Sequence, residues 1–177
     1  MPSVRAAAPP CAPHSSDREP TLQYRETTPP DYAMRVRVYY EDTDAGGIVY
    51  HANWLRWFER VRTDWMRALG VEHARWLAET GTGFVVRDLS IDYLRPARLD
   101  DELLVDVRLL EARRATWILE QQARPAQGGE LLVGARLRIA AVHHASGRPT
   151  AIPKTLAERA LARRATALAP DSAPGRP

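Results

Sequence analysis

A carboxylate stands a few residues before the expected start of an amphipathic helix. Residues 39–54 read Tyr-Tyr-Glu-Asp-Thr-Asp-Ala-Gly-Gly-Ile-Val-Tyr-His-Ala-Asn-Trp, an acidic, glycine-containing turn that leads directly into an apolar-faced helix. This order places Asp44 beside the free backbone N–H groups of a helix N-terminus, which stabilise negative charge on a bound group. A carboxylate that can attack or deprotonate water, next to such an oxyanion site, is what ester or thioester hydrolysis needs.

Four more side chains near this turn could take part. Asp42 is interpreted as a turn residue, because Asp commonly hydrogen-bonds its own local backbone. His51, at the edge of the apolar helix, could be a packed structural histidine or could orient water or substrate. Tyr40 points from the preceding strand towards the turn, with core packing and a functional role both open. Glu59 follows His51 by about two helical turns, as a solvated helix carboxylate or a group that supports the site.

Two other kinds of chemistry are not favoured by these residues. A site for a soft metal would need cysteines or several histidines, and only one histidine is near. We therefore expect neither a metal nor a cofactor at the cluster of Asp42, Asp44, His51 and Glu59. The chain also lacks a Gly-x-Ser-x-Gly nucleophile elbow, which argues against a serine hydrolase.

The elements that must position these residues follow from the apolar spacing. Alternation from Met34 to Glu41 predicts a half-buried strand, and spacings of three and four predict a helix over residues 52–69, closed by Gly70. A shorter helix is expected over 72–79. Four extended segments follow, over residues 83–94 with a bulge near Arg87-Asp88, 102–111, 115–124 and 130–143. The order predicts an α+β fold: an antiparallel five-stranded sheet with one dominant helix.

Composition divides the chain into three parts. Residues 1–33 contain seven prolines and are expected to form a disordered leader, and residues 166–177 a disordered tail. The folded domain is therefore expected over residues 34–165, and deleting the leader should leave fold and activity intact. The alternative is that Leu22 and Tyr24 pin the leader to the domain, in which case the deletion lowers stability. The single cysteine, Cys11, has no partner for an intrachain disulfide. With no apolar run of membrane-spanning length, a cytoplasmic location without membrane insertion is the prediction.

The charge distribution restricts the partners. The net charge is +3, from 25 basic and 22 acidic residues that are interspersed. Since no long basic block with interleaved aromatics is present, nucleic acid is not expected as a partner. An anionic small molecule fits better, because a few arginines are enough to hold phosphates.

The long motif at residues 37–53 resembles the acyl-CoA thioesterases of the 4-hydroxybenzoyl-CoA thioesterase class. It is most similar to the YbgC-like group, which is encoded beside the bacterial Tol-Pal envelope genes. The resemblance extends over about residues 34–160 and includes Phe84-Val85-Val86-Arg87 and Pro96-Ala97-Arg98-Leu99-Asp100-Asp101. It implies the hotdog fold, in which a long antiparallel sheet wraps around a central helix. The leader has no counterpart in the family pattern.

The resemblance also implies roles for individual residues. Asp44 matches the catalytic aspartate, His51 a histidine at the helix start, and the His51 N–H the oxyanion donor. Tyr40, Tyr50 and Glu59 are expected to bind substrate beside them. Three arginines match positions that hold the phosphates of coenzyme A, namely Arg113, Arg114 and Arg148.

The implied substrate is an acyl-CoA with a short aliphatic or aromatic acyl group, and an acyl-carrier protein is a further expected partner. The implied assembly is a homodimer or homotetramer, with an acyl pocket between subunits. Whether Asp44 acts as nucleophile or as general base stays open. So do two other functions: an acyl-CoA or acyl-carrier-protein binding protein without turnover, and, less favoured, a hotdog dehydratase.

Overall fold

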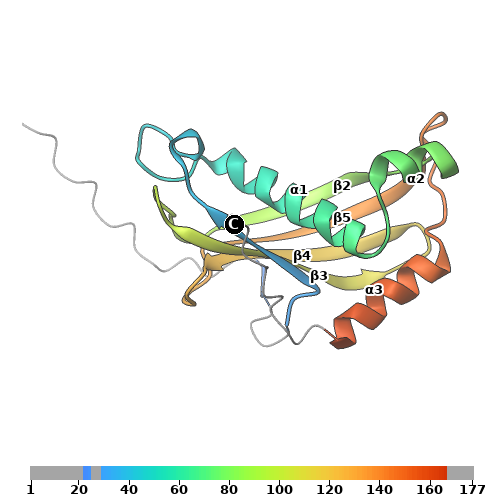
Figure 1. Cartoon of the computed structure of the whole chain (residues 1–177). Coiled ribbons are helices and arrows are strands. Elements are labelled where there is room, and N and C mark those ends of the chain that lie inside the picture. The colour runs from blue at the N-terminus through green and yellow to red at the C-terminus, as the bar shows by residue number, and fades with distance from the viewer. Residues whose placement is uncertain (1–21, 25–28, 167–177) are drawn as a thin grey trace, which may run out of the picture.

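A computed structural model describes residues 22–24 and 29–166 (Figure 1). The disorder expected for most of the leader and for the tail concerns residues outside this part of the chain. One five-stranded sheet forms the body of the domain, with the strand order β1-β3-β4-β5-β2 and antiparallel neighbours throughout. The strands are β1 (Tyr32–Arg37), β2 (Thr82–Tyr93), β3 (Glu102–Ala112), β4 (Thr116–Pro125) and β5 (Val133–His143). The edges of the sheet are therefore β1 and β2.

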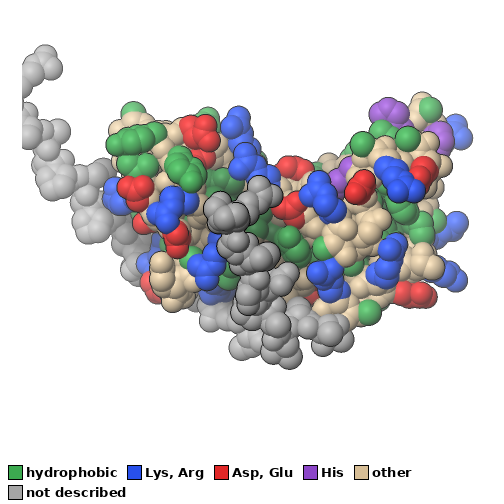
Figure 2. Space-filling view, viewed as in Figure 1, with side chains coloured by type: hydrophobic (Ala, Val, Ile, Leu, Met, Phe, Trp, Pro, Cys, Tyr) green, Lys and Arg blue, Asp and Glu red, His purple; other side chains and the backbone are tan. Residues whose placement is uncertain are grey.

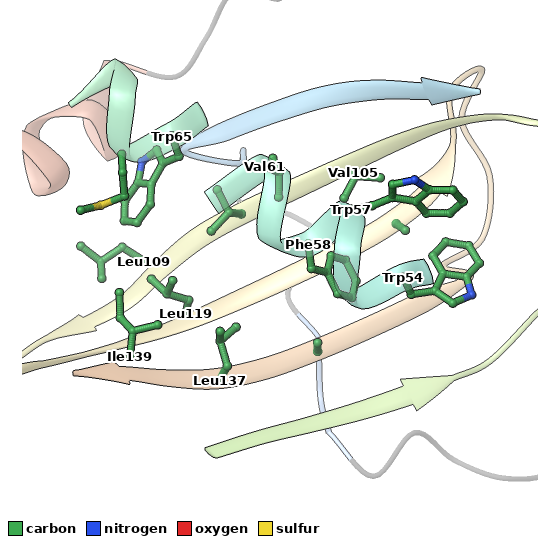
Figure 3. Close-up of a cluster of buried hydrophobic side chains, with 14 of the residues drawn as sticks. Trp54, Trp57, Phe58, Val61, Trp65, Val105, Leu109, Leu119, Leu137 and Ile139 are labelled. Atoms are coloured by element: carbon green, nitrogen blue, oxygen red, sulfur yellow. The ribbon is translucent and has the colours of Figure 1, made fainter. Parts of the chain in front are cut away.

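The long helix α1 (His51–Ala68) lies along one face of the sheet, which curves around it (Figure 1). Its apolar stripe is buried, with Trp54, Phe58, Val61 and Trp65 each at most 3% exposed. Figure 3 shows these side chains directed towards the sheet, where leucines of β3, β4 and β5 meet them. Each fully buried large side chain of this kind contributes about 1.5–3 kcal/mol to folding. The predicted α+β arrangement of one sheet and one dominant helix is confirmed.

Local sequence signals account for most element boundaries. The predicted bulge in β2 is confirmed, since the pairing with β5 shifts register between Val86 and Asp88. Gly70 has a φ of 82°, the left-handed conformation expected of a glycine that ends a helix. The short helix α2 (His73–Thr80) follows one turn later.

A third helix was not expected. α3 (Lys154–Thr166) packs beside β3 and buries Leu156 and Ala160, four residues apart. Its apolar face is narrow and rich in alanine, so the periodic signal is weak. The Arg163 guanidinium donates a hydrogen bond of 2.7 Å to the carbonyl of Ala68, at the C-terminus of α1. A cation there satisfies an orphan carbonyl and complements the helix dipole.

The beginning of the domain differs from the expectation. β1 starts at Tyr32, so the last two residues assigned to the leader belong to the sheet. Asp31 is also buried, and its Oδ2 accepts a 2.6 Å hydrogen bond from the Leu109 N–H. The expectation that residues 1–33 can be deleted without effect is therefore wrong in its boundary, because the deletion would remove part of β1.

The end of the first strand also differs. β1 stops at Arg37, and residues Tyr40–Asp42 form a 3-10 turn, η1. The Asp42 carboxylate accepts the Tyr39 N–H at 2.8 Å, which bends the chain out of the strand. Tyr40 is consequently 82% exposed and does not pack in the core.

Among the described residues, no helix is both long and apolar enough to cross a membrane.

Candidate active site

The turn that carries Asp44 is a tight loop closed onto itself. An isolated bridge joins Thr43 to Val49, the Asp44 N–H donates to the Ile48 carbonyl at 3.0 Å, and the Gly47 N–H donates back to the Asp44 carbonyl at 2.9 Å. Gly47 has a φ of 70°, which favours glycine at this position. The loop therefore holds Asp44 in a defined place relative to the helix that follows.

The two aspartates of the turn have different surroundings. Asp42 accepts hydrogen bonds on both carboxylate oxygens, at 2.8 Å from the Tyr39 N–H and at 3.4 Å from the Asn53 side chain. Asp44 is exposed, and its Oδ1 accepts a 2.7 Å hydrogen bond from the Gly46 N–H. Asp42 thus stabilises the turn, as interpreted from the sequence, while the Asp44 carboxylate faces solvent, where a ligand can reach it.

The start of α1 offers hydrogen-bond donors to a ligand. Tyr50 is the N-cap residue, and its carbonyl accepts the Asn53 N–H at 2.9 Å. The N–H groups of His51 and Ala52 precede the point at which a helical carbonyl can accept them. The first turn carries no acidic residue that would neutralise this end of the helix dipole. An oxyanion or a polarised carbonyl oxygen is the ligand that such an end stabilises.

His51 lies between two tyrosine rings. The Tyr50 ring centroid is 4.4 Å from that of His51, and the Tyr93 ring meets His51 edge-on at 6.4 Å. The Tyr93 hydroxyl donates a 3.1 Å hydrogen bond to the His51 carbonyl, and burial raises the pKa of Tyr93. Sequence reasoning missed Tyr93, although it ends a strand whose alternation had been recognised.

The tyrosines give this end of the molecule an exposed aromatic surface. Tyr39, Tyr40 and Tyr50 are 58%, 82% and 45% exposed. Figure 2 shows hydrophobic side chains gathered at the upper left, where α1 begins in Figure 1. Tyr40 and Tyr50 are thus near the turn, as predicted, and both are accessible to a substrate or a second subunit.

A cavity of about 220 Å³ lies farther along α1, between that helix and β2. Its polar lining residues are Glu59, Arg62, Thr63 and His73, and its apolar ones Trp65, Met66, Phe84, Val85, Val86, Leu119 and Ile139. The structure places Glu59 here, about 12 Å along the helix from His51, and not beside Asp44.

Hydrogen bonds order the polar side of this cavity. Arg62 donates at 2.7 Å to the buried Gln121 side chain, which in turn donates to the Phe58 carbonyl at 2.9 Å. Thr63 donates to Glu59 at 2.6 Å. Burial lowers the pKa of both Arg62 and His73. The cavity therefore combines an apolar floor with an ordered arginine and a histidine whose neutral form is favoured.

The three arginines expected to bind phosphates lie at the other end of the sheet. Arg113 and Arg114 occupy the β3–β4 turn, and Arg148 follows β5, whose last residues are at the same end. The Ile152 N–H donates to the Arg114 carbonyl, which ties the two segments together. Arg113 forms a bidentate ion pair with Glu111, at 2.6 and 3.0 Å, and is exposed.

One chain does not bring these arginines to Asp44. β3 has 11 residues, so at about 3.3 Å per residue the two ends of the sheet are roughly 35 Å apart. The α1 start lies at the end where β2 finishes, and the arginines lie at the end where β2 begins.

Nowhere in the described residues do three or more His, Cys, Asp or Glu side chains gather as a metal site would need.

Comparison with known proteins gives consistent matches over the domain. Residues 38–160 match a family model described as the thioesterase-like superfamily. The chain is 43% identical over 123 residues to the acyl-CoA thioesterase YbgC of Haemophilus influenzae, which covers 70% of this chain and 89% of that protein.

Two solved structures share the arrangement. A crystal structure described as a probable thioesterase from Bartonella henselae is 32% identical, with a TM-score of 0.64, and covers 69% of this chain and 99% of that one. A thioesterase from Thermus thermophilus, crystallised with coenzyme A and Zn, is 29% identical with the same TM-score, over 77% and 96% of the two chains.

Proposed function

The chain belongs to the thioesterase-like superfamily as a hotdog-fold acyl-CoA thioesterase similar to YbgC, and we propose that Asp44 and the start of α1 perform the hydrolysis. The observation that carries this proposal is the exposed Asp44 carboxylate in a rigid loop that runs directly into unpaired helix N–H groups. A carboxylate and an oxyanion donor set are then held by one continuous segment of eight residues, from Asp44 to His51.

The thioester carbonyl oxygen binds at the His51 N–H, where the helix dipole stabilises the charge that develops on it. In one route Asp44 attacks the carbonyl carbon, expels the coenzyme A thiolate and forms an acyl-enzyme anhydride that water hydrolyses. In the other, Asp44 takes a proton from a water molecule that attacks directly. Both routes yield the free acid and coenzyme A. His51 orients the water or the leaving thiolate.

A complete site requires a second copy of the chain, in this proposal. β2 is an edge strand with unpaired backbone groups, and it exposes Val85, Val86 and Leu89 by 36–48%. If two β2 strands pair antiparallel, the end of one β2 lies beside the start of the other. That arrangement brings the Asp44 loop of one subunit near the cavity and the arginine end of its partner, which one chain keeps far apart.

The cavity beside α1 then receives the acyl group. Its size suits a short aliphatic or an aromatic acyl chain, and Glu59 contacts the bound acyl group from the helix side. The Arg114 side chain, with Arg113 and Arg148, binds the phosphates of coenzyme A through charge-assisted guanidinium hydrogen bonds. Tyr40 and Tyr50 cover the thioester.

Two further expectations stay predictions. One is that an acyl-carrier protein can also donate the acyl group, and the other is that the protein is cytoplasmic.

Asp44→Asn tests the assignment. The variant should fold with an unchanged melting temperature and lose about 10²–10⁴ in kcat, the range for removal of a positioned acid–base group. Turnover is measured with a thiol-reactive dye and a panel of short, long and aromatic acyl-CoAs. Asp64→Asn, which removes a partly exposed carboxylate of α1 that lies outside the site and outside the β2 edge, is the matched control. Wild-type turnover by Asp44→Asn would show that another residue performs the chemistry. Binding of acyl-CoA without any turnover by the wild type would favour a non-catalytic binding protein.

A further inference from the structure

The outer face of the sheet, opposite α1, carries a seat for a residue of the N-terminal segment. Tyr24 lies against Gly134 of β5, so closely that a Cβ on Gly134 would be only 2.3–2.7 Å from three atoms of the tyrosine ring. The φ of Gly134 is not positive, so its backbone conformation does not itself require glycine. Glycine at this position instead allows the Tyr24 ring to approach the strand closely.

Two hydrogen bonds fix the segment there, and both go to the same carboxylate. The Tyr24 hydroxyl donates to Asp92 Oδ2 at 2.9 Å, and the Leu22 N–H donates to the same oxygen at 3.1 Å. Asp92 pairs with Gly134 across the β2–β5 ladder, so ring and carboxylate form one contact. Partial burial, together with the Asp92 carboxylate, raises the pKa of the Tyr24 hydroxyl.

The next residue of β2 is Tyr93, whose side chain points to the opposite face of the sheet. There its hydroxyl holds the His51 carbonyl, 42 residues away in sequence, and its ring contacts the His51 ring. The last two residues of β2 thus contact the N-terminal segment on one face and the first residue of α1 on the other.

This end of β2 needs such restraint. Within the chain β2 has β5 as its neighbouring strand, and the terminal residues of an element open at lower free energy than its middle. Beyond Tyr93, the N–H groups of Leu94 and Arg95 share one acceptor, the Leu132 carbonyl. A displacement of one or two ångströms at Tyr93 would move His51 and the first-turn N–H groups, and such misplacement weakens catalysis strongly.

We propose that Leu22 and Tyr24 form a clamp on Asp92 that holds the end of β2, so that Tyr93 acts as a positioning residue for His51 and the first turn of α1. The catalytic consequence rests on the function proposed above, whereas the mechanical link does not. Tyr93 and the clamp act through His51 and touch no reacting atom.

Three variants test the link from both sides of the strand. Gly134→Ala displaces Tyr24 from its seat, Tyr24→Phe removes only the hydroxyl bond to Asp92, and Tyr93→Phe removes only the bond to the His51 carbonyl. Gly83→Ala is the matched control, because a Cβ at that β2 position meets nothing within 4 Å. The full-length protein is used throughout, with melting temperatures recorded for every variant.

The first measurement is amide hydrogen exchange, which does not depend on turnover. Gly134→Ala and Tyr24→Phe should accelerate exchange at residues 91–93 and at the first turn of α1, roughly 3–10-fold for the loss of one hydrogen bond. Gly83→Ala should leave both regions unchanged. Faster exchange confined to the N-terminal segment, with the α1 start unaffected, would overturn the proposal.

The second measurement is the division between kcat and KM. Each of the three variants should lower kcat by roughly 3–10-fold with little change in KM, and Tyr24→Phe should have no further effect in a Tyr93→Phe background. Independent effects that add would show that Tyr24 does not act through Tyr93. Normal kcat in all variants, with Asp44→Asn inactive, would refute the clamp alone. A wild type without acyl-CoA turnover would refute the proposed function and leave the exchange result to decide on the clamp.

Discussion

Two aspartates that are identical in type and two positions apart differ in what the fold does with them. The carboxylate of Asp42 is used inside the protein, whereas that of Asp44 is presented to solvent. Asp42 was predicted to be a turn residue from the local hydrogen bonding that Asp commonly makes, whereas Asp44 was assigned to the chemistry through the family resemblance. The contacts of Tyr93 with His51 and of Gln121 with Arg62 could not be predicted, since they join residues 42 and 59 positions apart.

The basic pair at the β3–β4 turn gives a prediction for single side chains. Arg113 is held by Glu111, while the Arg114 side chain extends into solvent, so Arg114 should contribute more to phosphate binding. Arg113→Ala with Arg114→Ala should raise KM for acyl-CoA roughly 3–10-fold at constant kcat. Most of the increase should appear in Arg114→Ala alone.

A truncated substrate provides the control for this pair. Turnover of an N-acetylcysteamine thioester, which has no phosphates, should be nearly unchanged in both variants. Arg35→Ala, an exposed arginine on β1, is the control for the loss of positive charge elsewhere. An equal loss of activity on both substrates would indicate that the arginines are structural.

At the scale of elements, the sheet has an unusual outer face. Where α1 covers one face with apolar side chains, the other holds buried charged and polar groups, among them Asp106, Arg108, Glu120 and Gln122. Alternation in the sequence located β3 and β4 to within one or two residues, because the inward positions are apolar apart from Gln121. It did not indicate that the outward positions are buried as well, since polar residues normally mark the solvent side of a strand. α3 was missed for the complementary reason that its buried residues are few and small.

The Asp106 carboxyl makes this face sensitive to pH. Burial raises its pKa from 3.8 to about 6, although Arg108 and Arg124 oppose the shift. The folded protein therefore keeps this proton at pH values where the unfolded chain has released it. The contribution of protonated Asp106 to the free energy of unfolding is fully present below about pH 3.8 and is lost as the pH rises through about 6.

Asp106→Asn cannot titrate and should lose this dependence. The free energy of unfolding of the variant minus that of the wild type should increase by roughly 1–3 kcal/mol from pH 4 to pH 7. Urea unfolding at each pH unit measures the difference, and the ion pair with Arg108 that the variant breaks lowers its stability by a separate amount. A constant difference across the range would mean that Asp106 keeps its ordinary pKa in the folded protein.

For the whole molecule, the decisive feature is the exposed edge of β2. A charge placed on this edge should prevent strand pairing between subunits. Leu89→Lys should therefore convert an oligomer into a species near the chain mass of 19.9 kDa and abolish turnover together with assembly. Leu161→Lys, the same change at a similarly exposed leucine of α3, should preserve both.

Light scattering at micromolar concentration measures this outcome and also separates a dimer from a tetramer. A wild-type protein that is monomeric and active would contradict the shared site. So would a Leu89→Lys monomer with full turnover.

The position of the cavity farther along α1, away from the Asp44 loop, has a genetic consequence. A dimer built as proposed has two sites, and each takes its carboxylate from one chain and its acyl cavity from the other. When a chain defective in Asp44 meets a chain defective in the cavity, one site of the mixed dimer inherits both defects and the other inherits neither. Two inactive alleles of this protein can therefore complement each other, which an enzyme with its whole site in one chain does not allow.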